Sequence, residues 1–214
     1  MTFEEFEKRI VNVTKMELPG EQLHLAMAPI QRILELKRKA REMQNARKAG
    51  VMMLFYPDNE GETYFVLILR KSYKGVHSGQ VGFPGGKLEP EDTSLQVAAI
   101  RETEEEVGVP SEKINVLRAL TELYIPPSNF FVQPYLGYMT ETPSFIAQEE
   151  EVEAIIEVPL SHFMDDGIHI TKTLSTSYAQ SIEVPAFLLN GHVVWGATAM
   201  MLNEVRTMLD EVLS

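Results

Sequence analysis

The chain has 214 residues, 44% of which are hydrophobic, and it contains no cysteine. This length is enough for one sizeable core but too short to expect two full domains, and the lack of cysteine excludes disulfides and zinc–thiolate sites. The formal net charge of −12 argues against nucleic acid as a partner, because binding a phosphate backbone needs a basic surface. One small anionic substrate remains compatible with this charge, since a metal ion and a few lysines or arginines can reverse the field inside a cleft.

The N-terminal residues predict a helical extension, residues 1–50, ahead of the main domain. Phe3, Phe6 and Ile10 fall at helical spacing and predict a helix from about residue 3 to 13. The stretch that follows contains two prolines and a glycine and is expected to be a loop. Residues 30–49 have the composition of a basic amphipathic helix. Such a helix can dock on a membrane or an acidic partner, but in an acidic protein we expect it to pack on its own domain or on a second subunit.

The sequence gives no sign of a targeting or membrane-spanning segment. The first residues, MTFEEFEKRI, lack the basic start and apolar run of a signal peptide. No segment approaches the ~20 consecutive apolar residues that cross a bilayer. We therefore expect a cytoplasmic protein that does not bind membranes.

Runs rich in β-branched and aromatic residues predict a sheet from residue 51 onward. Residues 51–56 and 63–69 are a predicted hairpin around a Pro-Asp-Asn-Glu-Gly turn, and a polar loop, 70–80, leads into a short strand, 81–83. The loop over 124–129 carries an aromatic residue and two prolines, and is expected either to line a pocket or to be a plain crossover. The later elements are predicted as strands over 114–123, 130–139, 152–158, 167–174, 182–189 and 192–195, a helical turn over 160–164, and a C-terminal helix that opens at Trp195 and runs through Leu213.

The most informative stretch is a predicted helix over 94–107, entered through a Phe-Pro-Gly-Gly turn and followed by Gly108. On a helical wheel, Glu102, Glu105 and Glu106 extend the apolar stripe that begins the helix. The stripe is made of Leu95, Ala98 and Ala99, and the second apolar side is made of Ile100, Thr103 and Val107. Three carboxylates on one partly buried face repel one another, so the pattern predicts a cation among them.

Divalent metals such as Mg²⁺ take oxygen ligands and usually bind through one or two carboxylates together with waters and substrate phosphates. The acidic helix face therefore indicates a metal that bridges protein and phosphate. Arg101 directly precedes the acids and can orient one of them with its planar guanidinium. The competing interpretation is a solvated face, which is the more common meaning of a bare run of glutamates.

Two other features are each more often structural than functional. Glu149, Glu150 and Glu151 stand directly before the predicted strand 152–158, and such a run is usually solvated. Trp195 can stack on an adenine, although a single tryptophan beside the start of a buried helix is more often part of the core.

The segment from Gly86 to Gly108 resembles the Nudix box. Its ending, Arg-Glu, any two residues, Glu-Glu, any residue, Gly, is matched in full. The mid-box acid is Asp92 instead of glutamate and the gap to Arg101 is one residue longer, and both departures recur in the coenzyme A pyrophosphatase branch of the family. The upstream run HSGQVGFPGG also resembles that branch, as do Trp-Gly-x-Thr-Ala and Val-Pro-Ala-Phe near the C-terminus. However, Gly75 stands where the branch usually has an arginine.

This resemblance implies an α/β class fold: a Nudix-type α/β/α sandwich with a mixed sheet over residues 51–214, after the N-terminal helical extension. It implies metal-dependent hydrolysis, with Mg²⁺ or Mn²⁺, of a diphosphate linkage in a nucleoside diphosphate derivative. In this branch the substrate is coenzyme A or its thioesters, cut to phosphopantetheine and adenosine 3′,5′-bisphosphate. An ADP-ribose or nucleoside diphosphate sugar pyrophosphatase is the alternative favoured by Gly75. A non-catalytic ligand sensor on the same fold is another, but it predicts that the metal acids are lost.

The resemblance also implies roles for individual residues. Glu102 and Glu106 are expected to hold the principal metal, with Glu105 on the same or a second ion and a carbonyl of Gly85 or Gly86 adding an oxygen. Asp92 is expected either to cap the helix or to touch the chemistry. The catalytic candidates are Arg101, Glu102, Glu105 and Glu151, of which Glu151 aligns best with the branch as a base or outer metal ligand; the candidates for substrate contacts are Arg70, Lys74, His77 and Phe83. The expected partner is a small nucleotide, and the expected assembly is a monomer or homodimer.

Overall fold

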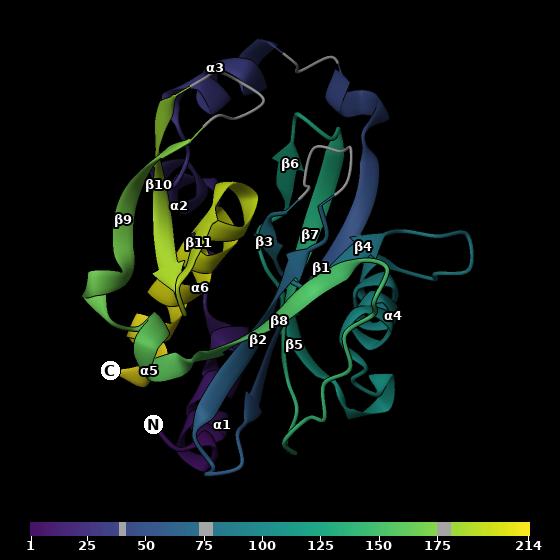
Figure 1. Cartoon of the computed structure of the whole chain (residues 1–214), viewed down its shortest axis with the longest axis vertical. Coiled ribbons are helices and arrows are strands. Elements are labelled where there is room, and N and C mark those ends of the chain that lie inside the picture. Colours follow the sequence, from purple (N-terminus) through teal and green to yellow (C-terminus); the bar gives the residue numbers. More distant parts are fainter. Residues whose placement is uncertain (39–41, 73–78, 175–180) are drawn as a thin grey trace.

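Strand β1 (Arg47–Pro57) is the central strand of the computed structural model, which describes residues 1–38, 42–72, 79–174 and 181–214 (Figure 1). It runs parallel to β7 (Phe130–Tyr138) along one edge. Along the other edge it changes partner, because Phe55 lies opposite β2 whereas Val51 lies opposite β4. The remaining strands of this mixed eight-stranded sheet are β2 (Thr63–Arg70), β3 (Val81–Gly82), β4 (Gly85–Lys87), β5 (Asn115–Ala119), β6 (Leu123–Ile125) and β8 (Val152–Pro159).

Helices cover both faces of this sheet, because the side chains of β1 are apolar in both directions. Met53 and Phe55 share one hydrophobic cluster with α1 and α6, whereas Met52 and Leu54 share another with helix α4. The expected α/β/α sandwich with a mixed sheet is therefore confirmed. The helices are α1 (Phe3–Ile10), α2 (Glu21–Ala26), α3 (Ile30–Arg38), α4 (Leu95–Val107), α5 (Leu160–Phe163) and α6 (Gly196–Leu213), with 3₁₀ turns at η1 (Val11–Lys15), η2 (Glu42–Asn45), η3 (Ser111–Lys113) and η4 (Asp166–Ile168).

Helix α4 packs directly against the backbone of β1. A Cβ added at Gly50 would overlap the carbonyl oxygen of Leu95 at the start of the helix, so this close approach requires glycine. Ser94 caps the helix by accepting a hydrogen bond from the Val97 N–H at 3.2 Å, and Gly108 ends it in the left-handed region at φ 74°. The predicted helix over 94–107 is thus confirmed.

A second, three-stranded antiparallel sheet lies beside the first and delivers the C-terminal helix. It consists of β9 (His169–Leu174), β10 (Ile182–Leu189) and β11 (His192–Trp195). Asn190 and Gly191 make the tight turn between β10 and β11 with φ values of 47° and 79°, which confirms the predicted hairpin. The last residue of β11, Trp195, is followed at once by α6.

The N-terminal segment contributes to the same core as the sheet. Phe3, Phe6 and Ile10 of α1 are buried in the cluster that contains Phe55 and Phe65, and the Phe6 and Phe55 rings are 4.8 Å apart. Helix α3 behaves differently from the expectation that its apolar face packs on its own domain: Ile30 and Leu34 are exposed, whereas Arg32 is buried. Packing on the chain's own domain is therefore wrong for Ile30 and Leu34, whereas packing on a second subunit, the other half of the expectation, stays a prediction.

Several predicted boundaries are wrong. The helix predicted over 30–49 does not reach residue 49, because residues 47–49 already pair with β7. Helix α2 lies in the stretch expected to be a loop. The strand predicted over 114–123 is divided into β5 and β6, and the one predicted from 167 begins at His169 after a 3₁₀ turn. The hairpin of β1 and β2, the short strand β3 and strands β7 and β8 lie where the sequence predicts them.

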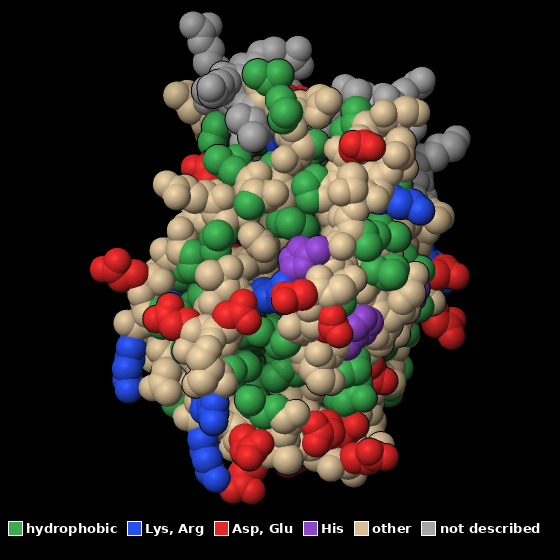
Figure 2. All heavy atoms as spheres, turned by 90° about the vertical axis from the view of Figure 1, so that its left-hand side faces the viewer, with side chains coloured by type: hydrophobic (Ala, Val, Ile, Leu, Met, Phe, Trp, Pro, Cys, Tyr) green, Lys and Arg blue, Asp and Glu red, His purple; other side chains and the backbone are tan. Residues whose placement is uncertain are grey.

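Charged side chains of both signs are scattered over the face shown in Figure 2. On the face shown in Figure 2, acidic side chains outnumber basic ones and are interspersed with apolar groups. Among the described residues, no helix has the length and apolar character needed to cross a membrane.

Candidate active site

The acidic face of α4 meets the turn at residues 83–86, which joins β3 to β4. Glu102 lies against this turn so closely that a Cβ at Gly86 would overlap its carboxylate. Residue 86 therefore has to be glycine, because a side chain there would displace the Glu102 carboxylate from the backbone of the turn. This contact places the Glu102 carboxylate beside the backbone at Gly86.

Glu106 is the most deeply buried of the box glutamates, with 2% of the residue exposed. Its Oε2 accepts a hydrogen bond from the Gly85 N–H at 2.7 Å, and its Oε1 lies 3.3 Å from a terminal nitrogen of Arg70 without an aligned hydrogen bond. Burial raises the pKa of Glu106 to about 7, and the nearby charges of Glu102 and Glu151 act in the same direction, whereas Arg70 and the Gly85 N–H lower it. The carboxylate is therefore held in place but only partly neutralised.

Arg101 connects the other acids of the helix. One terminal nitrogen lies 3.1 Å from Glu102 Oε1 and 3.0 Å from Glu105 Oε2. The side chain is anchored from behind by Asp92, which accepts from Nε at 3.1 Å and from a second terminal nitrogen at 3.0 Å. Burial raises the pKa of Glu102, while Arg101 lowers it. Arg101 thus lies between Glu102 and Glu105, in a position from which it can orient both.

Asp92 has neither of the two roles considered for it from sequence. Ser94, not Asp92, caps α4, and Asp92 is not among the residues that line the cavity. Its side chain is only 2% exposed and receives the Glu89 N–H at 2.9 Å in addition to Arg101. Asp92 is a positioning residue for Arg101, because its two oxygens match the guanidinium fork.

Glu151 reaches the same region because the loop before β8 closes over the C-terminal end of α4. The Ile146 N–H donates to the Val107 carbonyl and the Gln148 N–H to the Glu106 carbonyl, each at 3.0 Å. Glu151 follows within three residues and lines the cavity, whereas Glu149 and Glu150 do not. The caps that satisfy the helix end thus also bring the second acidic segment to the first.

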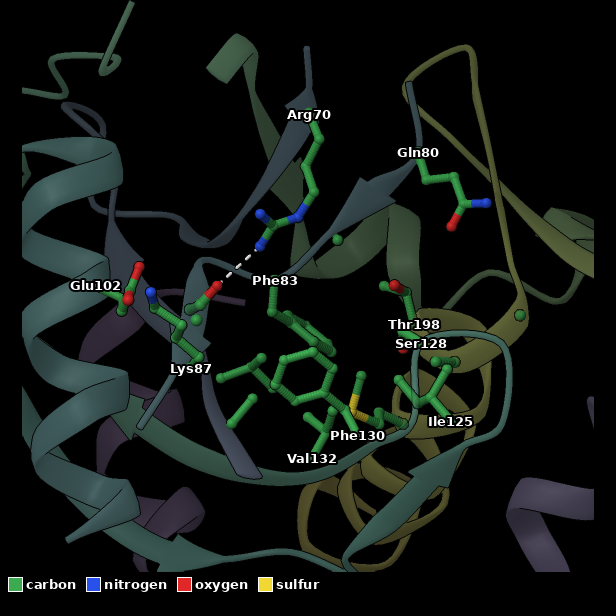
Figure 3. Close-up of a pocket in the computed structure, with 18 of the residues that line it drawn as sticks. Arg70, Gln80, Phe83, Lys87, Glu102, Ile125, Ser128, Phe130, Val132 and Thr198 are labelled. Carbon is green, nitrogen blue, oxygen red and sulfur yellow. Dashed lines mark hydrogen bonds between the residues drawn. The ribbon is translucent and has the colours of Figure 1, made fainter. Parts of the chain in front are cut away.

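A cavity of about 670 Å³ opens in front of these residues. In Figure 3, Glu102, Lys87 and Arg70 lie at its acidic end, and Phe83, Phe130 and Val132 form an apolar floor. The opposite side carries polar groups at Gln80, Ser128 and Thr198. The far wall is built by the β6–β7 loop and the start of α6. Its lining residues are Ile125, Pro127, Ser128, Trp195, Ala197, Thr198, Met200 and Met201, with Pro29 and Arg32 from the N-terminal segment.

The cavity gathers eight residues that the sequence proposes for the site, from segments far apart in the chain. These residues are Arg70, Phe83, Gly86, Arg101, Glu102, Glu105, Glu106 and Glu151. Lys74 and His77 lie outside the described residues. Ile125, Pro127 and Ser128 of the 124–129 loop line the cavity, which is the pocket-lining alternative for that loop. Trp195 also lines the cavity.

Sequence reasoning missed several lining residues. Thr198 was visible only as part of the Trp-Gly-x-Thr-Ala motif; its hydroxyl donates to the Val81 carbonyl at 3.0 Å and ties α6 to β3. Arg32 reaches the cavity only because α3 folds back over the β6–β7 region, where its guanidinium donates to the Tyr124 carbonyl at 2.7 Å. No local pattern in the sequence reports such a long-range contact.

The residues present suit a divalent cation that prefers oxygen ligands. Glu102, Glu106 and Glu151 supply carboxylates, the turn supplies carbonyls, and the buried Oε1 of Glu106 has no aligned hydrogen-bond donor. Within the described ranges, no three acidic or histidine side chains converge on a common point; Glu106 lies against Arg70, and Glu102 lies against Arg101. Glu102 and Glu106 nevertheless stand one turn apart on α4, so side-chain rotation alone can bring them together.

Glu105 is the exposed member of the set. Its side chain is 56% accessible and its identified partner is Arg101. The geometry is therefore better suited to an outer role for Glu105 than to the innermost ligand position.

Comparison with known proteins places this architecture in context. The family model for the NUDIX domain matches residues 46–171. An uncharacterized Nudix hydrolase NudL of Yersinia enterocolitica is 41% identical over 99 residues, which are 46% of this chain and 50% of that protein. Its counterpart in Yersinia pestis is 32% identical over 153 residues, 67% of this chain and 71% of the relative. The chain thus matches half of the first relative's length and more of the second.

Solved structures show the same arrangement of helices and strands. The Nudix hydrolase RenU of M. smegmatis superimposes with a TM-score of 0.52 at 14% identity, covering 78% of this chain and 88% of its own. A MutT/nudix family protein from Enterococcus faecalis gives a TM-score of 0.52 at 19% identity, covering 90% of this chain and 73% of its own. At these identities the likeness establishes the fold.

Proposed function

Because this chain belongs to the Nudix hydrolase family, we propose that it hydrolyses the diphosphate linkage of coenzyme A or its thioesters in a reaction that depends on Mg²⁺ or Mn²⁺. The products are phosphopantetheine, or its acylated form, and adenosine 3′,5′-bisphosphate. The observation that carries this proposal is the cavity itself, which combines the box acids at one end with the apolar floor of Phe83, Phe130 and Val132. The cytoplasmic location and the monomeric or homodimeric state stay predictions.

The acidic end supports diphosphate chemistry. A divalent cation, when bound, offsets charge on the phosphate oxygens and lowers the pKa of a water. Glu102 and Glu106 would hold it, and Gly85 or Gly86 would add a main-chain oxygen. Arg101 keeps Glu102 and Glu105 oriented, and Glu151 stands at the edge of the set as the candidate to accept a proton from the attacking water.

Basic residues on the same side suit the charge of the substrate. Arg70 and Lys87 line the acidic end of the cavity. Cations fixed in a partly dry cleft stabilise charge that develops on a phosphoryl group without having to reorganise. These residues explain how a chain with a formal net charge of −12 can accept an anion.

The apolar floor of the cavity favours coenzyme A over a sugar nucleotide. Phosphopantetheine is a long arm with methyl and methylene groups, which can be buried against Phe130 and Val132 of the floor and Met201 of the far wall. A ribose or hexose would bring several hydroxyls to the same apolar side chains, and buried hydroxyls without partners cost free energy. The observation that favours ADP-ribose is Gly75, which stands in place of the arginine of the branch motif. ADP-ribose is therefore the second candidate substrate.

The test is a substrate panel with product analysis. We expect the purified full chain to convert coenzyme A and short acyl thioesters, with Mg²⁺ or Mn²⁺, to two products identified by mass spectrometry. ADP-ribose should react with a lower kcat/KM. The variant Glu102→Gln, prepared in parallel, should be inactive, which excludes a contaminating enzyme. Faster turnover of ADP-ribose would replace the first substrate by the second, and binding without turnover of any substrate would favour a ligand sensor.

A further inference from the structure

The Arg70 guanidinium lies against two oxygens of the proposed metal site, the Gly85 carbonyl oxygen and Glu106 Oε1. Arg70 extends from the end of β2, and Figure 3 shows it reaching across the cavity toward the turn at residues 83–86. One terminal nitrogen donates to the Gly85 carbonyl at 2.8 Å and the other lies 3.3 Å from Glu106 Oε1. Since the Gly85 N–H also donates to Glu106 Oε2, Arg70, Gly85 and Glu106 form a closed ring around one carboxylate.

A guanidinium and a divalent cation would compete for these two oxygens, because each is drawn to the same side of them. Mg²⁺ binds oxygen at about 2.1 Å and requires the lone pairs that face the Arg70 nitrogens. The two positive groups would also lie within a few ångströms of each other in a half-buried site, where repulsion is weakly screened. By contrast, the hydrogen bond from the Gly85 N–H uses Oε2 and leaves Oε1 open to a change of partner.

Arg70 differs in this respect from Arg101 and Lys87, the two other basic residues near the box acids. Arg101 keeps two hydrogen bonds to Asp92 whatever happens to its contacts with the box acids, and Lys87 pairs with Glu89. Within the described part of the chain, the contacts of the Arg70 guanidinium are Gly85 and Glu106 alone. Its side chain is 25% exposed toward the cavity, so it can turn without breaking a second anchor.

We propose that Arg70 and the divalent cation compete for Glu106 Oε1 and the Gly85 carbonyl, and that the displaced guanidinium becomes a ligand of the substrate's diphosphate. This inference rests on the proposed metal-dependent function. The planar guanidinium fork matches two phosphate oxygens, so the group released by the cation is suited to the anion that follows. Cation and substrate should therefore bind with positive coupling, each favouring the position of Arg70 that the other requires.

The first test measures metal affinity without substrate. Mn²⁺ binding is followed by electron paramagnetic resonance for the wild type, Arg70→Ala and Lys87→Ala, with thermal melting to establish that each variant is folded. We expect Arg70→Ala to bind Mn²⁺ about tenfold more tightly, the size of one lost competing charge-assisted hydrogen bond. Lys87→Ala removes the same charge from the cavity but no contact with Glu106, so it should change the affinity by less than about threefold.

Two outcomes of this measurement would overturn the inference. Equal tightening in Arg70→Ala and Lys87→Ala would mean that only the general field changed. Unchanged or weaker binding in Arg70→Ala would mean that Arg70 supports the metal ligands instead of competing for them. If wild type and Glu106→Gln bind Mn²⁺ equally, the proposed metal site itself fails, which is a separate result.

The second test needs no folded alanine variant. The ¹⁵N–¹H signal of the Arg70 Nε, assigned by its loss in Arg70→Lys, should shift on saturation with Mg²⁺ and shift again with a non-hydrolysable diphosphate analogue. At saturating metal, Arg70→Lys should raise KM for the substrate more than it lowers kcat. An Arg70 signal that is unaffected by Mg²⁺ contradicts the exchange directly.

Discussion

Replacing Glu106 by glutamine should abolish turnover and yet stabilise the fold when no divalent cation is present. The carboxylate is buried, which raises its pKa from an ordinary value of 4.5 to about 7. An acid whose pKa is higher in the folded than in the unfolded state contributes nothing below the unfolded value, where both states are protonated. Its effect becomes destabilising as pH rises from about 4.5 to about 7, and it is fully destabilising above that range.

The size of the effect follows from two opposing contributions. One pKa unit corresponds to about 1.4 kcal/mol, so ionised Glu106 destabilises the fold by about 3 kcal/mol above pH 7. Glutamine removes this term and still accepts the Gly85 N–H, but its amide group faces the donors of Arg70, which offsets about 1–2 kcal/mol. We therefore expect Glu106→Gln to be more stable than the wild type by roughly 1–2 kcal/mol at pH 8, and less stable by roughly 1–2 kcal/mol at pH 4.5, where Glu106 is protonated in the folded state and only the amide term remains.

The assay is urea unfolding at pH 4.5 and pH 8 in the presence of a chelator, together with steady-state kinetics in Mg²⁺. Turnover should fall by about 10²-fold or more, because a required metal ligand is lost. Added Mg²⁺ should raise the stability of the wild type but not of the variant. The matched control is Glu104→Gln, an exposed glutamate of the same helix, which should leave both properties within the error. A Glu106→Gln protein that is less stable than wild type at pH 8, or that turns over at a near-normal rate, would refute the reasoning.

Two further substitutions test the frame around the acids. Gly86→Ala adds a methyl group where the Glu102 carboxylate lies, so it should weaken Mn²⁺ binding and lower kcat by about tenfold or more with an unchanged far-ultraviolet spectrum; a variant with normal metal affinity contradicts the contact. Asp92→Asn removes the charged anchor of Arg101, and should cost roughly 1–3 kcal/mol in urea unfolding at pH 7. Arg101 lowers the pKa of Asp92, so its stabilising effect is present above the ordinary carboxyl range and is lost as pH falls through the lowered pKa; a stability difference that persists unchanged at strongly acid pH would disprove this origin.

The sequence predicts well those elements whose pattern is local. The box helix is marked by its apolar stripe and by Gly108, and the structure has both, although the cap is Ser94 and not the Asp92 considered from sequence. It predicts poorly where long-range pairing decides. The stretch that begins at Arg47 has no strand pattern of its own, but β7 pairs with it from the first residue. Helix α2 is short, and its place depends on the buried contact of His24 with Glu204 at 2.9 Å, 180 residues away. Neither pairing leaves a periodic signal.

The candidate site divides in the same way. The acidic residues of α4 could be predicted because they share one helix face, and Glu151 because its segment resembles a known pattern. The ring formed by Arg70, Gly85 and Glu106 could not, because it arises where β1 exchanges one partner strand for another and brings the end of β2 next to the turn. The role of Asp92 was also hidden, since an acid just before a helix looks like a cap until the position of Arg101 is known.

The far wall of the cavity is built from three separate parts of the chain: the N-terminal segment, the β6–β7 loop and the start of α6. Pro29, Arg32 and the start of α6 lie outside residues 46–171, the region shared with the family, whereas the acids lie inside it. The cavity is therefore completed by two segments outside the matched region, so a change in either segment would alter the shape of the far wall while the acidic face of α4 stays as it is.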